Sequence, residues 1–142
     1  MTSSRNVTHE IHLQIDSDFD IIVARQKGRQ MANELGFGPT DSTLIATAIS
    51  ELARNMVAYA HRGEIVLQSI DHGDPPGILV TAFDKGPGIP DVVQALLDGY
   101  STSGSLGLGL PGVKRLMDEF EISSEMGHGT TVTARKWKRR AA

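Results

Sequence analysis

The sequence predicts an α/β (α+β) two-layer sandwich, with a mixed, mostly antiparallel sheet and helices on one face. Segments with strand periodicity come mainly as adjacent pairs, each joined by a short turn, which favours antiparallel neighbours. Successive strand–helix–strand units, which build a doubly wound dinucleotide-binding fold, are missing from the predicted order. A chain of 142 residues is long enough to bury a hydrophobic core, so one domain is expected over residues 1–142.

The first part of the chain is predicted to form a strand and two helices. Residues 7–16 alternate apolar and polar side chains with the period of a half-buried strand. A helix is expected to begin at Ser17 or Asp18 and to end at Gly36 in the left-handed conformation. A second helix, beginning near residues 39–41, carries the clearest apolar stripe in the chain: Leu44, Ile45, Ala48, Ile49, Leu52, Met56 and Val57.

The rest of the chain is predicted to form two hairpins separated by a helical region. Residues 64–71 and 77–84 have the pattern of two strands joined by a turn. A short helix at 91–97 and a longer one at 110–119 follow, the second with a proline tolerated in its first turn. A terminal hairpin over 120–137 closes the domain.

Composition excludes several classes of function. The chain has no cysteine, which excludes disulfides and thiolate metal sites. No apolar run approaches the roughly 20 residues that span a bilayer, and no secretory signal is recognisable, so we expect a cytoplasmic protein without membrane contact. The net charge of −3 argues against nucleic-acid binding. Basic residues that crowd the C-terminus form either a solvated tail or a patch for an acidic partner: Arg135, Lys136, Lys138, Arg139 and Arg140.

Two polar groups beside predicted core elements are candidates for chemistry. Glu51 and Asn55 are four residues apart on the second helix and therefore share one face. Asp84 ends an apolar strand and is followed by Gly86 and Gly88, which let the backbone approach a flat ligand because they have no Cβ. Taken singly, the first pair is more often structural, and the second is also good turn chemistry.

Two glycine-rich segments complete the set. Residues 104–110 precede a predicted helix, and their exposed N–H groups together with a helix N-terminus suit phosphate groups. The surrounding stretch, 99–109, is expected to be a mobile loop that closes over a bound triphosphate. Residues 127–131 (GHGTT) on their own indicate only a hairpin turn.

The order of these four clusters is more specific than any one of them. ELARN (51–55), DKGPG (84–88), GSLGLGL (104–110) and GHGTT (127–131) resemble, in sequence and spacing, the N, G1, G2 and G3 boxes of the GHKL ATPases with the Bergerat fold. The resemblance covers essentially the whole chain, and residues 36–55, 107–122 and 129–137 look like the corresponding segments of the RsbT-type serine/threonine kinases of stressosome signalling. The anti-sigma-factor serine kinases are further relatives on this view.

The resemblance implies a role for each matching residue. Glu51 matches the catalytic carboxylate that positions or deprotonates the attacking hydroxyl. Asn55 matches the asparagine that binds Mg²⁺ at the ATP phosphates, and Asp84 matches the acceptor for the adenine amino group. The other implied ATP-binding residues are Gly86 and Gly88 at the base, Gly104, Gly107 and Gly109 in the phosphate-binding box, and Thr131 near the adenine.

The resemblance also implies a function and partners. It implies an Mg²⁺- and ATP-dependent kinase that phosphorylates Ser or Thr of STAS-domain proteins and, after release, binds a PP2C-type phosphatase. The alternative is a nucleotide-gated binding module, such as an anti-sigma factor or phosphatase activator, in which phosphotransfer is incidental. Retention of both Glu51 and Asn55 favours the kinase. Arg54, between them, is expected to be solvated, to contact a partner or to contact phosphate.

Overall fold

The computed structural model describes residues 9–70, 75–86 and 109–138. The predicted short helix at 91–97 and all but the last residue of the predicted loop at 99–109 lie outside these residues. The described elements, in chain order, are β1 (Glu10–Ile15), α1 (Asp18–Glu34), α2 (Pro39–Tyr59), β2 (Gly63–Ile70), β3 (Gly77–Asp84), α4 (Gly109–Leu116), β4 (Glu119–Glu125) and β5 (Gly129–Trp137).

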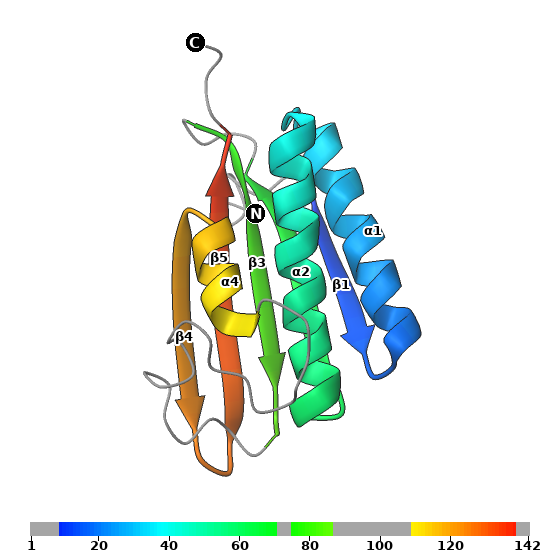
Figure 1. The fold of residues 1–142 in the computed structure, drawn as a ribbon, viewed down its shortest axis with the longest axis vertical. Coiled ribbons are helices and arrows are strands. Elements are labelled where there is room, and N and C mark those ends of the chain that lie inside the picture. The colour runs from blue at the N-terminus through cyan, green and yellow to red at the C-terminus, as the bar shows by residue number, and fades with distance from the viewer. Residues whose placement is uncertain (1–8, 71–74, 87–108, 139–142) are drawn as a thin grey trace.

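These elements form two layers, as predicted. The five strands make one sheet in the order β1-β2-β3-β5-β4, and every neighbouring pair is antiparallel. Figure 1 shows α1, α2 and α4 lying together over one face of this sheet. The expected sandwich with helices on one face is therefore confirmed.

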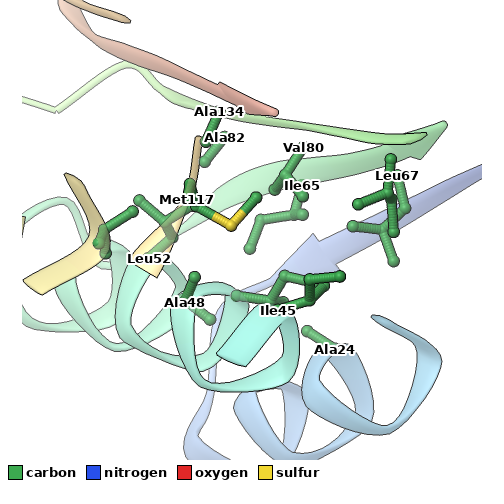
Figure 2. Close-up of a cluster of buried hydrophobic side chains, with 14 of the residues drawn as sticks. Ala24, Ile45, Ala48, Leu52, Ile65, Leu67, Val80, Ala82, Met117 and Ala134 are labelled. Atoms are coloured by element: carbon green, nitrogen blue, oxygen red, sulfur yellow. The ribbon is translucent and has the colours of Figure 1, made fainter. Parts of the chain in front are cut away.

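The core lies between the two layers. Alternate strand residues face the helices, as in β3, where Ile78, Val80 and Ala82 are buried. Leu79, Thr81 and Phe83, which alternate with them, are more exposed. Figure 2 shows side chains of β2, β3 and β5 meeting the apolar stripe of α2. The side chain of Met117, which follows α4 in the chain, packs into the same cluster. The stripe predicted on the second helix is thus the face that builds the core.

The two long helices pack closely and in opposite directions. At Gly28 of α1, an added Cβ would lie 2.2 Å from Ile49 Cδ1 of α2, so a larger residue at this crossing would require the Ile49 side chain to move. The turn between them begins at Gly36, which has φ +91° as predicted. The N–H groups of Gly36 and Phe37 donate to the carbonyls of Asn33 and Ala32, the bonding pattern of a Schellman motif.

Helix α4 is shorter than predicted. It ends at Leu116 rather than near Glu119, because Glu119 already belongs to β4 and pairs with Arg135 of β5. Lys136 Nζ donates to the carbonyl of Leu116 at 2.9 Å, and Asp118 N–H donates to the Arg135 carbonyl. These hydrogen bonds with β5 end the helix at Leu116, and the local apolar periodicity of the sequence could not predict them.

The order of the elements brings distant parts of the sequence to one end of the molecule. The first turns of α1, the last turns of α2, the end of β3 and the start of β5 lie at the lower end in Figure 1, and the first turn of α4 lies above them, nearer the middle of the molecule. In the described part of the chain, no helix is long and apolar enough to cross a bilayer.

Candidate ATP and phosphotransfer site

Glu51 is the one carboxylate buried among the described residues. It lies on α2 with 6% of its surface exposed, where a charged side chain is rarely found without partners or a function. Its Oε1 accepts a hydrogen bond of 3.2 Å from Gly109 N–H, at the first residue of α4. Gly109 has φ +67°, a conformation that favours glycine. The structure thus brings together two predicted site residues that are 58 positions apart.

Arg54 contacts the other oxygen of the same carboxylate. Its Nε lies 3.5 Å from Glu51 Oε2, and its side chain is 49% exposed. Of the three options for Arg54, the structure shows an ion pair to Glu51 on one side and open solvent on the other. Glu51 Oε1 therefore has a hydrogen-bond donor, and Oε2 has an ion-pair partner.

Asn55 follows one turn later on α2 and is half-buried. The helix places it on the same face as Glu51. Its amide oxygen is a ligand of the kind that Mg²⁺ accepts. Among the residues that the structure describes, no group of three or more His, Asp or Glu side chains is arranged to hold a metal.

Asp84 ends β3 at the same end of the sheet. Its Oδ1 accepts a 2.8 Å hydrogen bond from Gly86 N–H, a local turn that fixes the carboxylate. A Cβ on Gly86 would lie 2.7 Å from the Cβ of Ala60, at the end of α2. The predicted glycine is therefore required here because it lets the chain after β3 pass directly beneath α2.

The start of β5 completes this end of the sheet. Gly129 has φ +113°, and an added Cβ would meet the carbonyl oxygen of Asp84 at 2.0 Å. Thr130 pairs with Asp84 and so lies on the helix-covered face of the sheet, whereas Thr131 pairs with Phe83 and is exposed on the other face. On this geometry Thr130, rather than the predicted Thr131, shares a face with Asp84.

Three predicted ATP-binding residues, Gly88, Gly104 and Gly107, lie outside the described residues. Ala60, Gly129 and Thr130 were not predicted individually as site residues, although Gly129 and Thr130 belong to the GHGTT cluster. The alternation of β5 contained a signal for Thr130, because Val132 and Ala134 are its apolar partners with period two. Nothing local in the sequence indicated the contacts of Gly129 and Ala60, which depend on how β3 meets α2 and β5.

Comparison with known families gives a match over most of the chain. Residues 40–140 match the family described as histidine kinase-, DNA gyrase B-, and HSP90-like ATPase. The chain is 52% identical over 127 residues to serine/threonine-protein kinase RsbT of Bacillus subtilis (strain 168), covering 89% of this chain and 96% of that protein. It is 29% identical over 136 residues to anti-sigma F factor of Geobacillus stearothermophilus, covering 90% and 92% of the two chains.

Solved structures share the fold. The RsbU and RsbW domains of a Mycobacterium tuberculosis protein match with a TM-score of 0.66 at 21% identity, over 94% of this chain and 34% of that one. The SiaB-SiaC complex of Pseudomonas aeruginosa matches with a TM-score of 0.62 at 12% identity, over 95% and 92%. At these identities the likeness concerns the fold alone.

Proposed function

This chain belongs to the histidine kinase-, DNA gyrase B-, and HSP90-like ATPase family and, within it, to the RsbT-type serine/threonine kinases; we propose that it transfers the γ-phosphoryl group of Mg²⁺-ATP to a Ser or Thr of a STAS-domain protein. The observation that carries the proposal is the buried carboxylate of Glu51, oriented by Gly109 N–H and one helical turn from Asn55. A module that only binds nucleotide has no need for a fixed base next to the metal ligand.

The proposed transfer uses Glu51 as the proton acceptor. The acceptor hydroxyl oxygen forms a bond to the γ-phosphorus while the bond from that phosphorus to the bridging oxygen of ADP breaks. The hydroxyl proton passes to the Glu51 carboxylate, and ADP leaves with the bonding electron pair. Gly109 N–H and Arg54 keep the carboxylate in place during this step.

The residues present fit a magnesium ion held jointly with the nucleotide. Mg²⁺ prefers oxygen ligands and keeps several waters, so one amide oxygen from Asn55 together with phosphate oxygens is sufficient. When bound, the ion neutralises charge on the phosphates. Because the described residues offer no cluster of three acidic or histidine side chains, we do not expect Mg²⁺ to bind strongly without ATP.

Asp84 is the proposed adenine acceptor. Its Oδ1 is engaged by Gly86 N–H, so Oδ2 is the oxygen proposed to accept from the adenine amino group. The N-terminal end of α4 lies beside Glu51 on the opposite side of the site, and its positive dipole end suits a phosphate oxygen. Adenine and phosphates would therefore lie between β3 and α4.

A second candidate function is nucleotide-gated sequestration of a partner. It is favoured by the similarity to anti-sigma F factors, which reaches 33% identity over 104 residues for the protein of Halalkalibacterium halodurans. Binding to a PP2C-type phosphatase after release from the STAS-domain protein belongs to the first proposal. The two functions differ in whether the γ-phosphoryl group moves.

Single-turnover phosphotransfer to a STAS-domain protein that co-purifies with the chain tests the proposal. We expect Glu51→Gln to retain the shape of the side chain and the hydrogen bond from Gly109 N–H, to lose the ion pair with Arg54, and to slow transfer by roughly 10²-fold, the low end for general-base catalysis because the transition state is loose. ATP affinity, measured by calorimetry on the same variant, should be unchanged. Transfer at the wild-type rate would remove Glu51 from the mechanism, and absence of transfer by the wild-type chain would favour sequestration.

A further inference from the structure

Arg54 places a positive charge directly beside the proposed catalytic base. It lies on α2, three residues after Glu51 and immediately before Asn55. Its Nε lies 3.5 Å from Glu51 Oε2, while 49% of its side chain remains exposed. The arginine therefore extends from the buried carboxylate into the open part of the candidate site.

Most donors of the Arg54 guanidinium have no partner in the described structure. A guanidinium carries five N–H donors in a planar fork, and it is Nε that faces Glu51. Within residues 9–70, 75–86 and 109–138, neither Nη1 nor Nη2 makes an ion pair or a hydrogen bond. These two groups can therefore bind an anion next to Glu51.

The ion pair with Glu51 does not by itself explain the arginine. A pair at i and i+3 with one half-exposed partner contributes little to the free energy of unfolding. A cation that only faces a catalytic carboxylate also favours the charged form, so it opposes uptake of a proton rather than assisting it. A second anion accounts for the position of Arg54 better, and in a phosphotransfer site that anion is the phosphoryl group.

The sequence offers no other cation from the segment that contains the predicted phosphate-binding box. Residues 86–113 contain no lysine, arginine or histidine. Lys85 precedes this segment and directly follows Asp84, the proposed adenine acceptor. Lys114 follows the segment, in the second turn of α4. Because phosphoryl transfer depends on neutralising the charge of the γ-phosphoryl oxygens, Arg54 is the side chain best placed to do so beside the base.

We propose that Arg54 is a further catalytic residue, whose Nη groups donate hydrogen bonds to nonbridging oxygens of the γ-phosphoryl group while Nε stays on Glu51. This inference rests on the proposed phosphotransfer and changes none of its bonds. The acceptor oxygen still attacks phosphorus, ADP still leaves with the electron pair, and Arg54 exchanges no proton. The planar guanidinium holds the base and the phosphoryl group at a fixed spacing and neutralises charge that spreads over the oxygens in the transition state.

A comparison of ATP with ADP tests this contact without relying on transfer, because the two nucleotides differ in the γ-phosphoryl group. We expect Arg54→Ala to weaken binding of Mg²⁺-ATP by about tenfold or more in calorimetry and to leave binding of Mg²⁺-ADP unchanged. Arg62→Ala is the matched control, because Arg62 is also exposed but lies in the turn between α2 and β2. It removes the same charge and should change the affinity for neither nucleotide. Both variants should keep the wild-type circular dichroism.

Single-turnover transfer to the co-purifying STAS-domain protein tests the catalytic part. At saturating ATP and acceptor, we expect Arg54→Ala to transfer roughly 10²- to 10³-fold more slowly than the wild-type chain. Added guanidinium ion should restore part of the rate, whereas urea, which has a similar shape without the charge, should not. Arg54→Lys should restore less than full activity, because it keeps the charge but loses the planar fork.

Each measurement has a result that contradicts the proposal. An unchanged ratio of ATP to ADP affinity in Arg54→Ala, or transfer at the wild-type rate, would remove the contact with the γ-phosphoryl group. A transfer defect that disappears at saturating acceptor would make Arg54 a contact for the acceptor protein instead. If the wild-type chain transferred nothing to its partner while Arg54→Ala still lost its selectivity for ATP over ADP, the kinase proposal would fail and the γ-phosphoryl contact would stand.

Discussion

At the scale of single residues, Asp84 combines a structural and a recognition role. One oxygen fixes the turn to Gly86, and the backbone carbonyl lies against Gly129 of β5. The carboxylate is therefore held in place before any ligand binds, which lowers the entropy lost when a base is recognised. A conservative change at this position should alter the choice of base more than the fold.

Asp84→Asn is expected to lower ATP affinity by roughly 10- to 150-fold, which corresponds to about 1.5–3 kcal/mol for a hydrogen bond to a charged group. Asparagine can still accept the bond from Gly86, so the turn should persist. Titration calorimetry with ATP and GTP measures the effect, and GTP should bind the wild-type chain poorly because guanine presents a carbonyl where adenine has its amino group. Unchanged ATP affinity in the variant would place the adenine elsewhere.

The two threonines of β5 give a second residue-level test. Thr130 Oγ1 lies 2.8 Å from Ser124 Oγ on the helix-covered face, next to Asp84 in register, while Thr131 is on the exposed face. We expect Thr130→Val to weaken ATP binding by roughly 2- to 12-fold, as for loss of one neutral hydrogen bond, and Thr131→Val to leave it unchanged. Ser124→Ala controls for loss of the Ser124 contact. The reverse ranking of the two threonine variants would restore Thr131 as the adenine neighbour.

Residue identity could be predicted from the sequence more readily than residue orientation. Glu51 and Asn55 were candidates because they lie one turn apart beside an apolar stripe, and the resemblance of ELARN (51–55) to the N box gave them roles; the structure shows Glu51 buried there. Thr131 and Thr130 differ only in the phase of a period-two strand, and the phase is set by pairing with β3. The contact between Glu51 and Gly109 depends on how α4 packs beside α2, which no local pattern encodes.

At the scale of elements, the pairing of β1 with β2 carries a charged cluster on the open face of the sheet. His12 Nε2 lies 2.6 Å from Glu10 Oε2, and His12 Nδ1 lies 2.8 Å from Glu64 Oε2. The hydrogen bond to Glu10, followed by that to Glu64, raises the pKa of His12, and the bond to His12 lowers the pKa of Glu10. The cluster thus links the edge strand to the sheet in a pH-dependent way.

The directions of the pKa shifts of His12 and Glu10 determine how the stability of the chain changes with pH. A raised histidine pKa gives stability that is fully present below its ordinary value of 6.5 and is lost as pH rises through the higher folded value. A lowered glutamate pKa gives stability that is present above its ordinary value of 4.5 and is lost as pH falls through the lower folded value. We expect the thermal midpoint of the wild-type chain to decline relative to that of His12→Gln as pH rises above about 6.5. Parallel pH profiles of the two proteins would show that the cluster contributes nothing.

The boundaries of helices were predicted well where a residue next to the boundary determines it. The end of α1 matched its capping glycine, Gly36, and the start of α2 matched Pro39, because these residues restrict the backbone by themselves. The end of α4 was misplaced by about one turn, because bonds from β5 to Leu116 and Asp118 stop the helix there. Hydrogen bonds from a distant strand that end a helix cannot be predicted from the sequence of the helix itself.

At the scale of the whole molecule, the candidate site joins both layers. Glu51 and Asn55 belong to α2, Asp84 and Thr130 to the sheet, and Gly109 to α4. A ligand that contacts all three must stabilise their packing against one another. Nucleotide binding is therefore expected to appear as a change in global stability as well as in the site.

Mg²⁺-ATP should raise the thermal midpoint more than ATP with a chelator, and Asn55→Ala should remove that difference. Ligand at about 100 times its dissociation constant stabilises the native state by about 2.7 kcal/mol, so a metal-dependent change in affinity is readable as a shift in midpoint. Asn55 is half-buried and alanine is the better helix former, so the ligand-free variant should be no less stable than the wild-type chain. The part of the stabilisation that depends on adenine should survive in Asn55→Ala and be lost in Asp84→Asn, which separates the two contacts. If Asn55→Ala kept the full Mg²⁺-dependent increment, the ion would have to be held by other residues.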